Sequence, residues 1–357
     1  MVTHRIAVAG ISAVAETYGE AIDGIDSADL VAGSCRTEAK GRAFADEYDC
    51  AWYDDTGAML DAGRPDVLVV CTPSGAHLEP TLAAANRGVD VLCEKPLEIT
   101  TERIDEMAAA AKSAGIRLGG VFNQRYSPVI QRLHKAAAAG RFGNLSVCTA
   151  SVPWWRDDEY YEGDWRGTAA LDGGGALMNQ SIHGVDVVQW VAGAAIGVDP
   201  AVNPVAEVFA YTDTLAHADD VVEVEDTAVA VLRFRDGTLG QVLAATSTYP
   251  GSRKRIEVGG RDGTVQVLED ELVTWQFRSE REGDGAVRDR FGDASGGGAA
   301  DPTAIDHEKH RRNVADFLRA RETGECYLLD VTEARKAVAI VEAIYESAST
   351  GEPVTVD

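Results

Sequence analysis

The sequence predicts an α/β protein made of two different domains. Short, continuously apolar runs alternate with helical patterns over the first third of the chain, which is typical of buried parallel strands joined by crossover helices. Beyond residue 205, strand-like runs follow one another with few helices between them, which indicates a largely antiparallel sheet. The length of 357 residues suits two domains. We expect a doubly wound parallel sheet at 1–122 and an α+β domain at 123–357. The C-terminal helix of the second domain could pack against the first.

Composition narrows the class of protein. The net charge is -25, the acids are spread along the whole chain, and 7 lysines accompany 26 arginines. Such a charge repels nucleic acid and anionic lipid, so neither is an expected partner. The pattern favours adaptation to high salt, although an ordinary acidic enzyme from a GC-rich genome would look similar. No run of about 18 apolar residues and no signal peptide is present, so we expect a cytoplasmic protein that does not span a membrane.

Metal and disulfide chemistry are not expected. The six cysteines lie far apart and form no CxxC pair, so the sequence suggests neither a zinc site nor a disulfide framework.

The first strand ends in a turn that resembles a dinucleotide-binding fingerprint. The run 5–10 is followed by Gly10-Ile11-Ser12-Ala13-Val14-Ala15 and then by a helix expected from about Glu16. In GxGxxG or GxGxxA turns the second glycine lets the backbone approach the pyrophosphate. Ser12 departs from that pattern, but serine is small and can donate to phosphate. The turn therefore predicts a Rossmann-type cofactor site.

The end of the second strand (29–34) bears on the choice of cofactor. An NAD enzyme normally carries an acid near this point, whereas here Ser34-Cys35-Arg36-Thr37 follows. Hydroxyls and a guanidinium suit a 2′-phosphate, because arginine offers a charged fork of donors. We therefore expect NADP in preference to NAD. Alternatively, Arg36 stacks on the adenine of either cofactor.

Two later strands deliver further candidates to the same sheet edge, since the carboxyl ends of parallel strands are where open α/β sheets bind ligands. The run 66–71 leads into Thr72-Pro73, with His77 before a helix at 78–87. His77 either contacts a ligand or has a local role at the helix N-terminus. The run 89–93 stops at Glu94-Lys95-Pro96. A cis peptide at Pro96 would turn the Lys95 side chain into a cleft; the alternative is a solvated ion pair.

The second domain begins with a helix at 127–139 and a strand at 145–152, followed by an aromatic loop. Trp154 and Trp155 precede Tyr160 and Tyr161, and then Trp165-Arg166. Aromatic rings stack on the apolar face of a carbohydrate while charged groups bond its hydroxyls, so we expect Trp165, Arg166 and Tyr161 on the substrate side. A packed surface loop anchored by tryptophan is the alternative, and Trp154 and Trp155 fit either.

A glycine-rich segment then leads into a helix expected from about Gly175. It places Asn179, His183 and Asp186 on neighbouring turns, because residues three and four apart share a helix face. Asn179 cannot act as a base, so we expect it to donate to substrate, which leaves the proton to His183 and Lys95. Asp186 either orients His183 or pairs with an arginine. A histidine in a satisfied core position is the alternative for His183.

The rest of the chain supplies the expected sheet and its closing helices. We expect a mobile loop at 280–302, which is rich in Gly, Asp and Ala. The expected strands are 205–211, 225–234, 238–245, 255–259, 264–268 and 272–277, and the expected helices are 307–323 and 331–347. The exposed face of this sheet predicts a homodimer or homotetramer.

Taken together, the motifs resemble the glucose-fructose oxidoreductase / inositol dehydrogenase / MocA family. Beside the segments above, Asn123-Gln124-Arg125-Tyr126 and Asp172-Gly173-Gly174-Gly175 carry the resemblance, whose spacing covers essentially the whole chain. The resemblance implies an NAD(P)-dependent oxidoreductase of sugars, cyclitols or their derivatives, with an open-faced, mostly antiparallel second sheet. The family often has aspartate at Asn179, which puts an Asp–His relay in doubt here.

The sequence thus predicts hydride transfer between a secondary hydroxyl and a nicotinamide. Lys95, His183 and Asn179 are the predicted catalytic residues, and Arg125, Trp165, Arg166, Asn179, His183 and Tyr161 the predicted substrate residues. The residues predicted to bind the cofactor are Gly10, Ile11, Ser12, Ala13, Val14, Ser34, Arg36, Thr37, Cys71, Thr72, Pro73, His77, Glu94, Lys95, Asn123 and Gln124. The alternatives are a non-catalytic NADP-binding regulator and a sugar–sugar oxidoreductase that retains its cofactor.

Overall fold

The computed structural model describes residues 3–163, 165–218, 220–292 and 307–357. The chain forms two compact units, Met1–Asn123 with Ile305–Arg335, and Gln124–Ala304 with Lys336–Asp357. Compared with the expected ranges, the first unit also includes Asn123 and residues 305–335, which contain helix α10 (His307–Thr323). Its residue His310 lies edge-on to the ring of Tyr18, at 5.3 Å between centroids.

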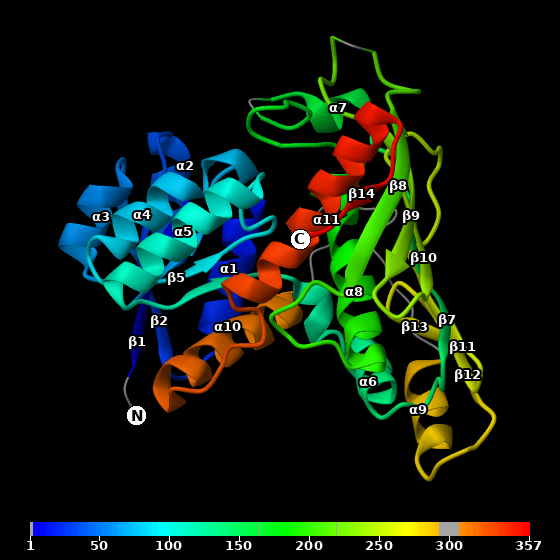
Figure 1. Ribbon diagram of the computed structural model, residues 1–357. Coiled ribbons are helices and arrows are strands. Elements are labelled where there is room, and N and C mark those ends of the chain that lie inside the picture. The colour runs from blue at the N-terminus through cyan, green and yellow to red at the C-terminus, as the bar shows by residue number, and fades with distance from the viewer. Residues whose placement is uncertain (1–2, 164, 219, 293–306) are drawn as a thin grey trace. The chain divides into compact units, whose positions relative to one another are not determined.

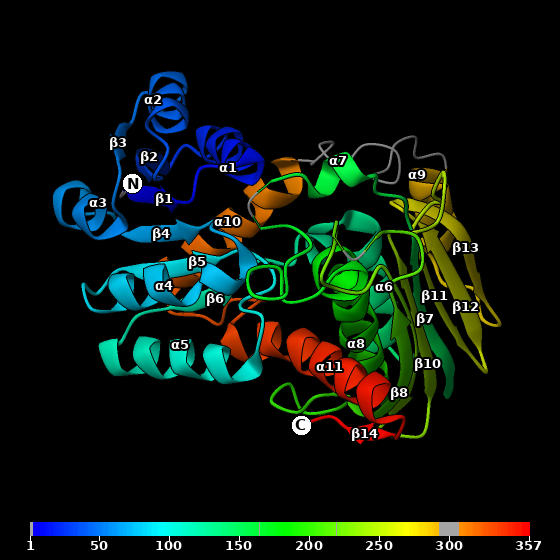
Figure 2. The same ribbon diagram turned by 90° about the horizontal axis from the view of Figure 1, so that it is seen from above.

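The first unit is a doubly wound parallel sheet, as expected. Its six strands lie in the order β3-β2-β1-β4-β5-β6, and every pairing is parallel. Helices α3, α4 and α5 lie together beside the sheet, and α1 packs against α10 (Figures 1 and 2). The central strands are fully buried because they carry apolar residues on both faces. The strands are β1 (His4–Ala9), β2 (Ala28–Ser34), β3 (Ala51–Tyr53), β4 (Val67–Val70), β5 (Asp90–Cys93) and β6 (Leu118–Gly120). The helices are α1 (Ala13–Asp23), α2 (Glu38–Glu47), α3 (Thr56–Gly63), α4 (Leu78–Ala85), α5 (Thr101–Ala114) and α10, with a short 3₁₀ turn at Ser74–Ala76. A second 3₁₀ turn, Asn123–Tyr126, begins at the last residue of this segment and continues into the second unit.

The second unit is built on an eight-stranded sheet in the order β13-β12-β11-β7-β10-β9-β8-β14. All of its pairings are antiparallel except that of β10 with β7. Helices α6 and α8 lie along one face of this sheet (Figure 2). Strand β9 alternates buried and exposed residues, as expected for a sheet with only one covered face. The strands are β7 (Leu145–Pro153), β8 (Val205–Asp213), β9 (Thr227–Phe234), β10 (Leu239–Ala245), β11 (Arg255–Gly260), β12 (Gly263–Leu268), β13 (Glu271–Phe277) and β14 (Val354–Thr355).

The helices of the second unit correct two expectations. The helix expected from Gly175 is divided, since a π-helical turn (Ala176–Ser181) precedes α8 (Ile182–Ile196). The expected mobile loop contains helix α9 (Asp284–Phe291), because Asp284 accepts hydrogen bonds from Trp275 Nε1 at 2.8 Å and from the Arg141 guanidinium. Residues 293–302 of that loop lie outside the described residues. The other helices are α6 (Pro128–Ala138), α7 (Asp158–Tyr161) and α11 (Val331–Thr350), which begins in the first unit.

Candidate active site

The fingerprint turn after β1 packs closely against the end of β4. Gly10 has a φ of +91°, and a Cβ at this residue would lie 2.6 Å from the backbone of Cys71 and Thr72. Ser12 is the N-cap of α1, with φ -141° and ψ -179°, and its side chain makes no capping hydrogen bond. This extended backbone is open to any residue, so serine replaces the second glycine without strain. The N-terminus of α1 is suited to an anion.

The residues at the end of β2 that were expected to select NADP differ in their exposure. Ser34 is only 2% exposed, and its hydroxyl lies 3.0 Å from that of Thr56, so it faces the protein rather than a ligand. Arg36 and Thr37 are exposed, and Thr37 is the N-cap of α2 without a side-chain capping bond. Of the three, Arg36 and Thr37 therefore remain available to a 2′-phosphate.

Strand β5 ends in a carboxylate that is tied to two helices. Tyr18 of α1 donates to Glu94 Oε1 at 2.8 Å, and His310 Nε2 of α10 lies 3.5 Å from the same oxygen. Burial opposes ionisation of Glu94, but His310, Lys95 and Tyr18 together lower its pKa. The other oxygen, Oε2, accepts from the backbone N–H of Lys95 at 3.0 Å. Glu94 thus fixes the backbone of Lys95, whose side chain is half-buried and whose peptide bond to Pro96 is cis.

His77 has a local role in the structure. Its Nε2 lies 2.8 Å from the Thr72 carbonyl oxygen, and its Nδ1 lies 2.9 Å from that of Pro96. The side chain is 1% exposed, and burial lowers the pKa of His77 while the facing carbonyls and Glu98 act in the opposite sense. His77 therefore joins the loop after β4 to the loop after β5. Of the two alternatives, the geometry favours the local one over contact with a ligand.

The first unit fits a dinucleotide cofactor on one further observation. Asn123 follows β6, which pairs with β5 in parallel, so both segments reach the same sheet edge. The Oδ1 atom of Asn123 is buried and has no hydrogen-bond partner among the described residues. An unsatisfied buried amide oxygen is costly, and a donor group of a ligand would relieve it. Gly10, Ser12 and Asn123 are thus the residues whose geometry fits the group.

In the second unit, Asn179 lies in the π-helical turn, a feature frequent at functional sites. Its Nδ2 donates to the carboxylate of Asp172, and its Oδ1 accepts from Gln180 Nε2 at 3.2 Å. Asp172 is buried and also accepts from the backbone N–H of Gly167 at 2.9 Å. His183 follows in the first turn of α8 and is half-buried. The sequence did not single out Asp172 as a partner of Asn179, because the contact depends on the fold of the glycine-rich loop.

Two of the predicted substrate residues have internal roles. Arg125 is fully buried, and its Nε and Nη2 donate to Asp186 at 2.8 and 2.6 Å. Its guanidinium also lies 4.9 Å from the centre of the Trp190 ring. This contact decides between the alternatives for Asp186 in favour of an arginine partner, and it leaves Arg125 facing the core rather than a ligand. Tyr161 is likewise buried and donates to the Thr246 hydroxyl at 2.9 Å.

The aromatic segment, residues 154–166, forms a set of ring and guanidinium contacts, which we call the platform. Trp165 and Arg166 lie at its end. Arg166 is exposed and lies 4.9 Å from the centre of the Tyr160 ring and 5.2 Å from that of Trp165, which is half-buried. Arg156 is 5% exposed, and it donates to the Trp155 carbonyl at 2.9 Å and to Gln180 Oε1 at 3.2 Å. Gln180 also donates to the Tyr160 hydroxyl at 2.6 Å. The platform is thereby joined to the turn that carries Asn179.

Distant residues hold this platform, and no local pattern in the sequence marks them. His217 Nε2 lies 2.8 Å from the Arg156 carbonyl oxygen, and its Nδ1 lies 3.0 Å from Asp226 Oδ2. Asp226 also accepts three backbone N–H groups from residues 215–217. Burial opposes ionisation of Asp226, but these hydrogen bonds lower its pKa.

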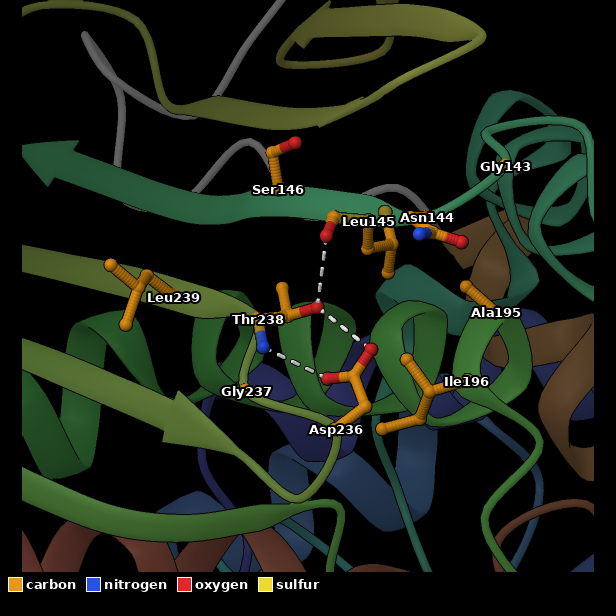
Figure 3. Close-up of a pocket in the computed structure, with 10 residues that line it drawn as sticks. All are labelled: Gly143, Asn144, Leu145, Ser146, Ala195, Ile196, Asp236, Gly237, Thr238 and Leu239. Atoms are coloured by element: carbon orange, nitrogen blue, oxygen red, sulfur yellow. Dashed lines mark hydrogen bonds between the residues drawn. The ribbon is translucent and has the colours of Figure 1, made fainter.

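A hollow of about 640 Å³ in the second unit is not the candidate site. It lies between the turns at Asn144 and Gly237 and the end of α8, and none of its lining residues is one that the sequence singled out. Both oxygens of Asp236 face Thr238, as Figure 3 shows. The carboxylate of Asp236, the one acidic group among the residues that line the hollow, is therefore already bound within the protein.

The described part of the chain contains neither a membrane-spanning helix nor a cluster of metal-ligating residues. No helix there is both long and apolar enough to cross a membrane. Nor does that part hold a group of three or more His, Cys, Asp or Glu residues arranged for a metal ion.

Comparisons with known proteins decide the family. Residues 4–121 match the model of an oxidoreductase family with an NAD-binding Rossmann fold, and residues 130–266 match the GFO/IDH/MocA C-terminal domain. The chain belongs to the GFO/IDH/MocA oxidoreductase family. The resemblance seen in the motifs is therefore confirmed, together with the expected fold class.

Three relatives illustrate the range of this family. Myo-inositol 2-dehydrogenase of Thermotoga maritima is 28% identical over 73% of this chain and 74% of its own. D-xylose 1-dehydrogenase (NADP(+)) 2 of Haloferax volcanii is 28% identical over 90% of each chain. The WlbA dehydrogenase of Bordetella pertussis, solved in complex with NADH and UDP-GlcNAcA, is 30% identical and covers 100% of this chain and 98% of its own, with a TM-score of 0.88.

Proposed function

We propose that this oxidoreductase is an NAD(P)-dependent dehydrogenase of a sugar, a cyclitol or a sugar derivative, oxidising a secondary hydroxyl. The observation that carries the proposal is the hydrogen bond from the Lys95 backbone N–H to Glu94. It lies at the carboxyl end of β5, at the same edge of the sheet as the fingerprint turn. The names of the relatives support the substrate class, since they include an inositol and a xylose dehydrogenase. Membership of an oxidoreductase family favours this enzyme over a non-catalytic regulator.

The protein's part in the reaction is to hold the substrate and move one proton. A bound nicotinamide supplies the hydride acceptor at its C4. The hydroxyl carbon loses a hydride and becomes a carbonyl, and the hydroxyl proton passes either to the neutral Nζ of Lys95 or to the imidazole of His183. Asn179, held by Asp172 and Gln180, orients the substrate beside His183. Trp165 and Arg166 are the proposed contacts with the rest of the sugar.

NADP is the proposed cofactor, in preference to NAD. Arg36 and Thr37 are exposed after β2, and Thr37 leaves its N-cap hydroxyl without a capping bond. A charged fork of donors beside a helix N-terminus suits a 2′-phosphate. The relative from Haloferax volcanii is named for NADP(+), whereas WlbA was solved with NADH, so relatives of both kinds exist.

A homodimer or homotetramer through the second sheet is part of the proposal, as is a cytoplasmic location. Large apolar side chains stand on the face of the sheet away from α6 and α8. Val231 and Leu239 are each 54% exposed and Tyr211 is 71% exposed. Apolar residues gathered on one face are typical of a protein–protein contact.

Direct titration with NADPH and NADH, followed by cofactor fluorescence in molar KCl, is the first test. We expect tight NADPH and weak NADH binding. A panel of sugars and cyclitols with NADP then identifies the substrate, and cofactor that stays bound through purification would favour the cofactor-retaining alternative. Binding of neither nucleotide to the folded protein would contradict the proposal.

The proton assignment is tested by Lys95→Ala, with Lys112→Ala as a matched control on the exposed side of α5. Loss of a proton-transfer group costs about 10²- to 10⁴-fold in turnover. We expect that loss for Lys95→Ala with nearly unchanged cofactor affinity, and wild-type behaviour for Lys112→Ala. Near-normal turnover of Lys95→Ala would exclude Lys95 from the reaction. A parallel His183→Gln variant shows which of the two groups sets the pH dependence.

A further inference from the structure

Glu225 is a buried carboxylate in the segment just before β9, and none of the roles above uses it. Its Oε2 accepts from the backbone N–H of Gly175 at 2.9 Å, and its Oε1 accepts from that of Leu177 at 2.8 Å. Tyr345 of α11 donates its hydroxyl to Oε1 at 2.9 Å. One side chain therefore binds two backbone donors at the start of the π-helical turn, where a helix leaves its first N–H groups unsatisfied.

The glycines of this segment are required by the same contact. A Cβ on Gly175 would lie 1.9 Å from the Glu225 carbonyl oxygen, and one on Gly174 would lie 2.1 Å from the Tyr345 hydroxyl. The backbone N–H of Ala176 donates to that carbonyl at 3.0 Å, and Met178 N–H donates to the Tyr345 hydroxyl at 3.3 Å. Only residues without a side chain let the loop approach so closely. The glycine-rich motif thus lets the backbone of 174–178 pack directly against Glu225 and Tyr345. We call this packing the seating of the turn.

This seating sets the position of the residues assigned to the reaction. Asn179 follows Leu177 by two residues, and its backbone N–H donates to the Gly175 carbonyl at 3.1 Å. Helix α8 begins directly after the turn and carries His183. A shift of Gly175 and Leu177 would therefore move Asn179 and the start of α8 together. Displacements of about 1 Å can cost about 10²-fold in rate.

We propose that Glu225, together with Tyr345, is a positioning residue that holds the turn bearing Asn179, and through it His183, in the geometry needed for turnover. The proposal rests on the proposed function for its kinetic consequence. It does not rest on that function for its structural consequence, which is the ordering of residues 174–178. The two can therefore be tested separately.

The surroundings of Glu225 make this device sensitive to pH near neutrality. Burial raises the pKa of Glu225 to about 7, although its hydrogen bonds act in the opposite sense. Tyr345 is its titratable neighbour, with a pKa raised far above its usual value by burial and by Glu225, and Asp172 acts on Tyr345 in the same direction. A protonated carboxyl has fewer acceptor sites for the two N–H groups. Turnover should therefore fall as pH falls through about 7.

Stability should change in the opposite direction over the same range. The folded-state pKa of Glu225 lies above its ordinary value of 4.5, so its protonation favours the folded state. That contribution is fully present below about 4.5, and it is lost as pH rises through about 7. An enzyme that gains turnover while losing this increment of stability across pH 4.5–7 is a signature that a purely structural carboxylate would not produce.

Hydrogen–deuterium exchange of the peptide covering 173–181 tests the seating without reference to activity. We compare the wild type with Glu225→Gln and Tyr345→Phe from pH 5.5 to 8.5, after correction for the intrinsic rate. Glu269→Gln is the matched control, since Glu269 is also buried in the second unit and accepts a backbone N–H, from Lys254 at 2.7 Å, away from the turn. We expect about 10-fold faster exchange of this peptide in the first two variants only.

Kinetics with the identified substrate supply the second readout. We expect turnover to fall about 10- to 100-fold in Glu225→Gln with an unchanged NADPH dissociation constant, and the acid limb near pH 7 to disappear. Tyr345→Phe should retain the acid limb of the pH profile but shift it, because the Glu225 carboxylate is still present and still titrates. Unchanged exchange in both variants would overturn the proposal, and so would faster exchange with unaltered turnover and pH profile. A wild type that oxidises no sugar would refute the proposed function, while the exchange data would still decide the seating.

Discussion

The candidate residues of the two units are held in place by different means. Lys95 stands at the end of a buried parallel strand, and the carboxylate that fixes its backbone is the preceding residue, Glu94. Asn179 stands in a π-helical turn that is supported by Asp172 from the segment just before it and by Glu225 and Tyr345 from two distant segments. The residue next in the chain therefore holds the backbone of Lys95, whereas side chains distant along the chain hold the backbone of the turn that bears Asn179.

The largest expected effect in this comparison is that of Asp186→Asn. Arg125 is fully buried and forms an ion pair with Asp186, so Asp186→Asn removes a carboxylate that faces a buried guanidinium. Breaking such a pair costs about 3–5 kcal/mol. Chemical denaturation followed by tryptophan fluorescence is sensitive here, because Arg125 lies over Trp190. Asp105→Asn, which opens the more exposed pair with Arg335, should change stability by less than about 1 kcal/mol. Equal losses in both variants would contradict a special role of the buried pair.

A smaller effect is expected for Tyr18→Phe in the first unit. The variant removes a hydrogen bond to a buried carboxylate, which is worth about 1.5–3 kcal/mol. Because the folded-state pKa of Glu94 is lowered, its contribution to stability is present above its ordinary pKa and is lost as pH falls through the folded value. Without the Tyr18 hydroxyl that pKa rises, so acid unfolding should begin at higher pH. Acid titrations that coincide for variant and wild type would show that Glu94 is held without Tyr18.

The effect of Arg36→Ala is expected on one cofactor alone. A charge-assisted contact to a 2′-phosphate is worth about 1.5–3 kcal/mol, which is about 10- to 150-fold in affinity. NADPH binding should weaken by that factor while NADH binding stays the same, as measured by fluorescence titration. Lys112→Ala is the charge-matched control. Equal weakening for both nucleotides would instead support stacking of Arg36 on the adenine.

The smallest effect is expected for Ser12→Gly, which restores the second glycine of the fingerprint. Ser12 already has an extended backbone that any residue can adopt, and its hydroxyl makes no capping bond. Cofactor affinity should therefore change by no more than about threefold, or less than about 0.7 kcal/mol. A large gain in affinity would show that the serine side chain obstructs the pyrophosphate.

Much of the first unit could be predicted from sequence, because its strands are continuous apolar runs between helical patterns. The expected helix at 78–87 begins at the same residue as α4 and ends two residues later, and the expected strand at 29–34 differs from β2 by one residue. The helix at 307–323 was also expected, but its place in the first unit was not. Chain order gave no reason to bring His310 to Tyr18 and Glu94, because that contact joins residues more than 200 positions apart.

The second unit shows where pattern reasoning ends. Strands β7 to β13 were expected within a few residues of their observed ends, because their alternation marks one covered face, whereas the two-residue strand β14 was not expected. Helical spacing alone did not reveal the π-helical turn, because its wider geometry depends on the seating of Gly175 on Glu225. Nor could spacing show that Arg125 and Tyr161 turn inward.

The sequence by itself determined the family, the doubly wound sheet and the candidate residues at its edge, since apolar periodicity and short motifs are local properties. Only the tertiary structure showed which of these residues bind partners inside the protein. Ser34, His77 and Arg125 find their partners inside the protein, because buried polar groups must be satisfied by neighbours that are distant along the chain. The same requirement revealed Glu225 and Tyr345, whose significance lies wholly in what they contact.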